Sequence, residues 1–139
     1  MSGSTNLSHL LGSMKPELHE EVYVFATVTD DRLPANLAPV MQFKEVEGTT
    51  LIVSLAEAEG AGIKREFPCR MITLNIHSSL DAAGFLAFIT ERLATLNIGV
   101  NPVSGFYHDH LFVPVNSAAE VLAELKLLSA QHAELSNTV

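Results

Sequence analysis

The sequence predicts an α+β protein made of two small units, each an antiparallel sheet with helices packed on one face. First, the 139-residue chain is 47% hydrophobic and 17% charged, which is typical of a globular protein that forms a core without disulfides. Second, stretches rich in β-branched and aromatic residues alternate with stretches at helical spacing. Third, TLIVSLAEA and HLFVPVNSA both pass from a strand pattern into helix-forming residues, as a diverged duplication would.

The first half is expected to begin with a short helix and to continue with three strands. Apolar residues recur at helical spacing from Leu7 to Met14, Asn6 can cap the start, and Pro16 marks the end. EVYVFATVT reads as a strand covered on both faces, and DDRLPANLAP reads as a loop. VMQFKEVEGTTLIVSL reads as two strands joined at Gly48, and AEAEGAGIKRE as a weak helix between the halves.

The second half is expected to follow the order strand, helix, strand, strand, helix, starting near Phe67. Its first strand covers residues 70–76, and Ser78 and Asp81 then have the spacing of a capping box, so the long helix is expected to begin there. GVNPVSGF and LFVPV form a hairpin, and NSAAEVLAELKLLSAQ forms the closing helix. The long helix carries one apolar stripe, made of Ala82, Phe85, Leu86, Ile89, Leu93 and Leu96.

The two units, residues 1–65 and residues 66–139, differ by one helix. Residues 30–39 follow the first strand of the first unit, but this segment is short and contains two prolines, so it cannot supply a helix after that strand. The N-terminal helix is a candidate for the vacant place.

Charge and cysteine content exclude several classes of protein. With 16 acidic and 8 basic side chains the net charge is -8, and without a basic cluster we expect neither a nucleic-acid nor a membrane partner. The single Cys69 is expected to be buried and inert, since one cysteine cannot form a disulfide within the chain. The N-terminus lacks the pattern of a signal peptide and no apolar run reaches about 18 residues, so we expect a cytoplasmic protein.

Few residues suit catalysis. Arg70 beside Cys69 favours a lower thiol pKa, but no glycine-rich elbow, base at a defined spacing or phosphate loop accompanies the pair. We therefore expect no enzymatic activity and assign no cofactor.

The turn before the long helix is the candidate ligand site. A helix start offers unpaired amides and the positive end of the helix dipole, which suit the carboxylate of an amino acid. Gly84 allows close approach, and Asp81 suits a ligand's ammonium group. The simpler alternative is that a serine only caps the helix. The candidate ligand-binding residues are His77, Ser78, Ser79, Asp81 and Gly84.

The stretch GFYHDHLF raises the question of a metal site. His108 and His110 would point the same way on a strand, but a metal needs three or four ligands, and His77 is the only further imidazole that suits the site. Asp109 is a favoured turn residue, so a hairpin turn is the preferred interpretation and no metal ligand is assigned. Tyr107, His108 and Asp109 are also candidates for covering a cleft or fixing the contact between the units.

The second half resembles the ACT domain, whose loop commonly reads Asp, any residue, Pro, Gly before an apolar helix. The resemblance is carried by IHSSL at the end of a strand, DAAGFL at the head of a helix and LNIGVNPVSG before a hairpin. Asp81 and Gly84 match, and Ala83 stands where proline is usual. ITLNIHSSLDAAG and GFYHDHLFVPV are also similar to a bacterial family of small proteins of uncharacterised function with two ACT-like units in tandem, and the similarity extends from about Leu10.

The resemblance implies an α+β protein of two tandem ferredoxin-like, ACT-like units with sheets packed or aligned side by side. It also implies a non-enzymatic regulatory module that binds an amino acid or related carboxylate where the units meet, near residues 77–81 and residues 30–36. A signal would then pass through a partner protein or a homo-oligomer. Two alternatives stay open: a structural or protein-interaction module without a ligand, and a metal-binding protein that uses the histidines of the HDH turn.

Overall fold

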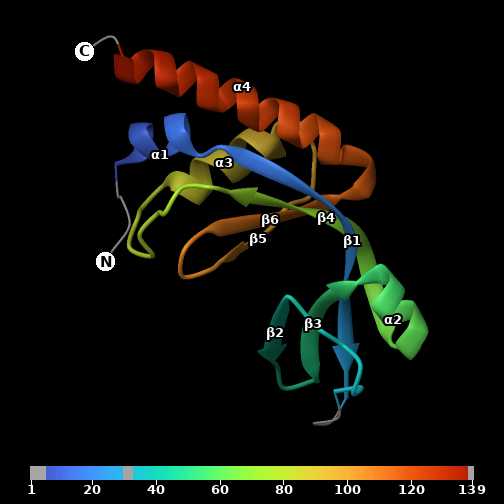
Figure 1. Ribbon diagram of the computed structural model, residues 1–139. Helices are drawn as coiled ribbons and strands as arrows, with labels where there is room; N and C mark the ends of the chain where they lie inside the picture. The colour runs from blue at the N-terminus through green and yellow to red at the C-terminus, as the bar shows by residue number, and fades with distance from the viewer. Residues whose placement is uncertain (1–5, 30–32, 138–139) are drawn as a thin grey trace.

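Two long paired strands form the centre of the computed structural model, which describes residues 6–29 and 33–137 (Figure 1). Strands β1 (Pro16–Val28) and β4 (Lys64–Leu74) run antiparallel, with Pro16 opposite Leu74 at one end and Thr27 opposite Lys64 at the other. In the described part of the chain they belong to one six-stranded sheet with the order β2-β3-β1-β4-β6-β5.

A hairpin flanks each of the two long strands. β2 (Met41–Lys44) and β3 (Thr49–Ser54) add to β1, and β5 (Asn101–Ser104) and β6 (Asp109–Pro114) add to β4. The sheet is strongly curled, and the two hairpins lie at opposite ends of the bend (Figure 1). The expected two sheets, packed or aligned side by side, are therefore aligned and continuous, because β1 and β4 each contribute to both halves.

The helices cover the outer face of this bend, as an α+β fold with helices on one face requires (Figure 1). α2 (Leu55–Ala61) covers the half that contains β2 and β3. A 3-10 turn (Val115–Ser117) leads into the long closing helix. The other half is covered by three helices: α1 (Leu7–Ser13), α3 (Phe85–Ala94) and α4 (Ala118–Asn137).

Strand alternation divides the apolar side chains between the two faces of the sheet. Leu111 and Val113 of β6 join the core beneath α1, α3 and α4, whereas Phe112 between them points to the helix-free face. There Phe112 lies edge-on to Tyr23 and Phe25 of β1, with ring centroids 6.0 and 5.9 Å apart, and this contact fills the inside of the bend.

The bend coincides with a β-bulge in β4. The register between β1 and β4 shifts between Tyr23 and Phe25, opposite Phe67 and Pro68, and Phe67 has a left-handed φ of 62°. A bulge bends a strand and is one of the few places in a central strand that tolerates proline. β4 therefore runs from Lys64 through Pro68 to Leu74, whereas the strand expected from the sequence covered only residues 70–76.

The N-terminal helix is not in the place expected for it. Leu10, Leu11 and Met14 are fully buried in the same core as α3 and α4, so α1 does not fill the vacant helix position of the first unit. Asn6 caps α1 as expected, since its side chain accepts a hydrogen bond from the His9 amide. The division between residues 65 and 66 stays a prediction, and β4 runs across it.

Cys69 is buried on the helix-free face, as expected from the sequence. Burial raises the pKa of its thiol to about 12, and the thiol donates a hydrogen bond to the carbonyl of Tyr23. The thiol is therefore protonated at neutral pH and a poor nucleophile. Among the described residues, no helix has both the length and the apolar character needed to span a membrane.

We predict that Leu11→Ala lowers the free energy of unfolding by about 2–5 kcal/mol, because it opens a cavity where α1 meets α4. The matched control is Leu127→Ala on the exposed side of α4, which should change stability by no more than about 0.5 kcal/mol. Urea unfolding followed by circular dichroism measures both. Equal effects for the two variants would show that α1 is not part of the core.

Candidate functional site

The loop between β4 and α3, residues 75–84, is held by a buried contact with the second hairpin. The hydroxyl of Ser78 donates a hydrogen bond to Oδ2 of Asp109 at 2.8 Å, and both side chains are buried. Asp109 is the first residue of β6 and pairs with Leu74 and Ser104. The expectation that Asp109 is a turn residue is wrong, because the turn ends at His108.

The capping-box prediction for the long helix is also wrong. α3 begins at Phe85, and its N-cap is Gly84 with a left-handed φ of 90° and no side-chain hydrogen bond. Ser78 is engaged by Asp109 instead, and the hydroxyl of Ser79 accepts a local hydrogen bond from the amide of Asp81. The start of α3 therefore lacks a capping side chain, and no acidic residue lies in its first turn.

A cavity of about 210 Å³ lies at this helix start. The loop, the first turn of α3 and the second hairpin all contribute to its wall. Ser78, Ser79, Gly84 and Asp109 line it, whereas the other candidate residues His77, Asp81, Tyr107 and His108 do not. Sequence reasoning missed the remaining wall residues, which are Leu80, Ala82, Phe85, Leu86, Ala87 and Ser104.

The candidate residues outside the cavity form an aromatic contact at the surface. The ring of His77 lies 5.8 Å from that of Tyr107 and 6.4 Å from that of Phe106. Phe106 and Tyr107 remain about two-thirds exposed in the turn of the second hairpin. This contact joins the loop to the hairpin from the outside, in parallel with the buried contact between Ser78 and Asp109.

The histidines of the HDH stretch, His108 and His110, lie on the helix-free face. They belong to a row of polar side chains that also includes Thr73 and His19. Nδ1 of His110 is 3.0 Å from the hydroxyl oxygen of Thr73, and that oxygen is 2.8 Å from Nε2 of His19. His108 lies beside His110, with ring centroids 6.5 Å apart. His19 was not considered from the sequence, because only the pairing of β1 with β4 and β6 brings it to this row.

The row does not present the ligand set of a metal ion. Thr73 separates the imidazoles of His19 and His110, and His77 packs against aromatic rings instead of approaching His108. In the part of the chain that the structure describes, no group of three or more His, Cys, Asp or Glu side chains is arranged to hold a metal. Burial, followed by the charge of His108, lowers the pKa of His110, and Asp109 opposes this shift.

Comparison with family models identifies the same type of unit twice along the chain. Residues 2–70 match a model described as an ACT domain, and residues 66–126 match a second model with that description. A search of curated proteins found no match.

Comparison with solved structures supports this assignment. A protein of unknown function from Vibrio cholerae, described as a possible transport protein, is 38% identical over 88% of this chain and 95% of its own, with a TM-score of 0.79. The regulatory subunits of aspartate kinase from Thermus flavus and Thermus thermophilus share the fold. The first is 9% identical over 92% of this chain and 99% of its own, with a TM-score of 0.61, and the second is 10% identical over 84% and 97%, with a TM-score of 0.62.

We predict that Ser78→Ala lowers the free energy of unfolding by about 1–3 kcal/mol, because it removes a donor from a buried carboxylate. Ser79→Ala is the matched control and should cost less, since its hydroxyl accepts only a solvent-exposed amide bond. Chemical denaturation of both variants at pH 7 compares them. A cost for Ser79→Ala as large as that for Ser78→Ala would contradict the assigned role of the buried contact.

We predict that the protein loses stability as the pH falls below about 6.5, the ordinary pKa of histidine, in part because of His110. The folded state lowers the pKa of His110, so the unfolded state binds more protons in this range and becomes favoured. The loss should level off below the folded-state pKa.

His110→Asn should reduce this pH dependence, because it removes the titrating imidazole. Unfolding free energies measured from pH 5 to pH 8 test this. A pH dependence that is identical in the wild type and His110→Asn would show that His110 does not contribute.

Proposed function

Because the chain belongs to the ACT-domain family, with two ACT units in tandem, we propose that it is a regulatory module that binds an amino acid or a related carboxylate at the start of α3. ACT domains are small-molecule-binding regulatory modules without catalytic activity of their own, and they typically work in the cytoplasm, where we place this protein. The aspartate kinase regulatory subunits with the same fold are an example of such regulation.

The observation that carries the proposal is the cavity at the uncapped start of α3. Its volume of about 210 Å³ lies below the range of pockets for drug-sized molecules, so it suits a ligand no larger than an amino acid. The first-turn residues Phe85, Leu86 and Ala87 line it, and the free amides and positive dipole end of a helix start favour a carboxylate. Neither Ser78 nor Ser79 occupies these amides.

The opposite wall of the cavity suits the other end of an amino acid. Asp109 is buried and accepts one hydrogen bond from Ser78 through Oδ2, and Ser104 lies beside it across the hairpin. A ligand ammonium group bound here would offset the charge of Asp109, while the ligand carboxylate meets the helix amides. One wall of the cavity thus offers a hydrogen-bond acceptor to the ammonium group of an amino acid, and the other wall offers donors to its carboxylate.

Binding would produce a signal only by favouring one arrangement of the loop relative to the second hairpin. The ligand would touch both elements, since Ser78, Ser79 and Gly84 come from the loop and Ser104 and Asp109 from the hairpin. β5 is an edge strand of the sheet, so a shift of this hairpin changes a surface available to a second copy or a regulated partner.

A protein-interaction module without a ligand is the second candidate. Leu80, Phe106 and Tyr107 are each about two-thirds exposed, and the loop and the hairpin turn carry them on the same part of the molecule. Exposed apolar side chains that gather in one place are typical of contact surfaces between proteins.

The test is thermal melting of the untagged protein with each of the twenty amino acids and with succinate, malate and citrate. A ligand at 100 times its dissociation constant should stabilise the fold by about 2.7 kcal/mol. We expect a selective shift with one amino acid or with a related carboxylate. Absence of any selective shift would contradict the proposal and favour the interaction module.

The variant that assigns the site is Ala87→Asp, which places a negative charge in the first turn of α3 at an exposed position of the cavity wall. The charge favours the helix dipole but repels a ligand carboxylate, so binding should weaken at least tenfold without loss of folding. Ala119→Asp adds the same charge to the first turn of α4 and is the matched control. Equal weakening in both variants would place the ligand elsewhere.

A further inference from the structure

The beginning of β1 is held on the sheet by fewer backbone contacts than the rest of the strand. The register of β1 on β4 is interrupted between Leu18 and Val22, where three residues of β1, at positions 19–21, stand opposite one residue of β4. Before this interruption, in the described chain, only residues 16–18 pair with β4, and Pro16 has no amide hydrogen to donate. Side chains therefore carry a large share of the attachment of this segment.

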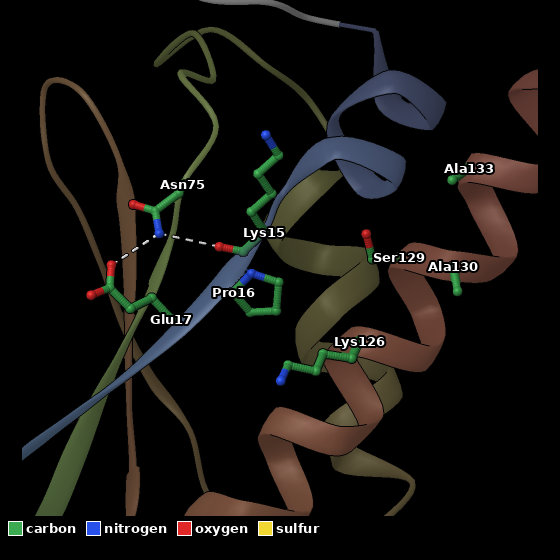
Figure 2. A pocket seen from close by; sticks show the side chains of 8 residues that line it. All are labelled: Lys15, Pro16, Glu17, Asn75, Lys126, Ser129, Ala130 and Ala133. Carbon is green, nitrogen blue, oxygen red and sulfur yellow. Dashed lines mark hydrogen bonds between the residues drawn. The ribbon is translucent and has the colours of Figure 1, made fainter.

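Two side chains hold the backbone of the segment. Asn75, which follows β4, donates from Nδ2 to the carbonyl of Lys15 at 3.2 Å and to the carboxylate of Glu17 at 3.1 Å (Figure 2). Arg70 of β4 donates from Nε to the carbonyl of His19 at 2.9 Å. These hydrogen bonds fasten the segment at its start and at the interruption.

The imidazole of His19 completes the attachment through a hydroxyl group that it shares with a second imidazole. Nε2 of His19 lies 2.8 Å from Oγ1 of Thr73, and Nδ1 of His110 lies 3.0 Å from the same oxygen. Thr73 is buried, and the three side chains come from the adjacent strands β1, β4 and β6. The contact therefore links the beginning of β1 to both neighbouring strands of this half of the sheet.

The shared hydroxyl group limits how many protons the two imidazoles can bind. Thr73 has one hydroxyl hydrogen, so it donates to one imidazole and accepts an N–H from the other when both are neutral. A first proton costs no hydrogen bond, because the imidazole that already donates to Thr73 binds the proton on its other nitrogen. A second proton makes both imidazoles donors, so the hydroxyl hydrogen loses its acceptor and two cations face one oxygen.

The surroundings of His110 also oppose a second proton. Burial, followed by the charge of His108, lowers the pKa of His110, and His19 adds to this shift whereas Asp109 opposes it. Among the described elements no helix covers this face, and β5 carries no titratable side chain. The carboxylates of β1 offset part of the added charge but do not restore the lost hydrogen bond. The charged side chains on the adjoining residues of β1 and β4 are Glu17, Glu20, Glu21 and Arg70.

We propose that His19, Thr73 and His110, which we call the histidine clasp, form a pH-sensitive device. The clasp holds the beginning of β1 on the sheet while both imidazoles are neutral or one is protonated, and it releases this segment when the second proton binds. Leu74, which pairs with Pro16, also pairs with Asp109 in the wall of the cavity at the start of α3. The clasp thereby makes the half of the sheet that carries this cavity sensitive to pH, whether or not the cavity binds a ligand.

The first test follows the imidazole nitrogens of His19 and His110 by nitrogen-15 NMR in the full chain without ligand, from pH 8 to pH 4. At pH 8 we expect one of the two nitrogens that face Thr73 to carry a hydrogen and the other to carry none. On acidification the pair should bind its protons in two steps separated by at least about 1 pH unit. Hydrogens on both facing nitrogens or on neither at pH 8 would overturn the proposal, as would a single common step.

The second test measures whether the second proton releases the strand. Hydrogen exchange of the segment 16–20 is compared at one pH above the first step and at one pH below the second, after correction for the intrinsic effect of pH on exchange. We expect the protection of this segment to fall about tenfold in acid, because local opening becomes easier. Unchanged protection would show that the second proton does not release the segment and would overturn the clasp.

Variants assign the acid effect to the clasp. Thr73→Val removes the shared hydroxyl group with little change in shape, and His19→Gln removes one titrating group, so both should lose most of the fall in protection. Thr73→Ser keeps the hydroxyl group and is the matched control that should retain it. Thermal melting confirms that each variant folds, and His19→Gln keeps the test decisive where Thr73→Val does not fold.

An acid effect that is as large in the folded variants as in the wild type would overturn the clasp. Because none of these measurements uses a ligand, failure of the clasp would not imply failure of the amino-acid site at the start of α3.

Discussion

The pairing of β1 with β4 is the interaction on which the rest of this structure depends. The C-terminal part of β1 pairs with β3 and the C-terminal part of β4 pairs with β6, so each long strand begins in one half of the sheet and ends in the other. Each half thereby gains a fourth strand from the other half. A single sheet follows, and neither half has a complete set of strands without its neighbour.

This sharing also explains the bend and what fills it. A straight sheet would leave its helix-free face open to solvent, but the bulge at Phe67 and Pro68 curls the sheet so that Phe112 meets Tyr23 and Phe25. Burial of these aromatic side chains favours the curled form. The helices on the outer face and the aromatic cluster on the inner face therefore stabilise the same curvature.

The sequence predicted the kinds of element well, because helical and strand periodicities are local properties of the chain. The sequence prediction was wrong where a contact between residues far apart in the chain determines the local structure. Ser78 has the spacing of a helix cap, but its hydroxyl bonds to Asp109, which is 31 residues away in the sequence. Likewise the strand expected at residues 70–76 begins at Lys64 in the structure, because the bulge opposite β1 makes room for Pro68 within β4. The wall residues of the cavity at the start of α3 come from the loop, the helix and the second hairpin, so no local pattern could have assembled them.

The second strands of the two hairpins, β3 and β6, pack in the same way but begin with residues of different chemistry. β3 and β6 have the same alternation of buried and half-buried residues from Thr49 to Ser54 and from Asp109 to Pro114, so both meet the same demand of the core. Their first residues are both buried, yet one is a hydroxyl and the other a carboxylate. A buried carboxylate costs more free energy than a buried hydroxyl unless it is hydrogen-bonded or paired. Asp109 meets this condition through the hydrogen bond from the hydroxyl of Ser78, so the first residue of β6 holds the loop before α3 in place, a role that Thr49 at the start of β3 does not have.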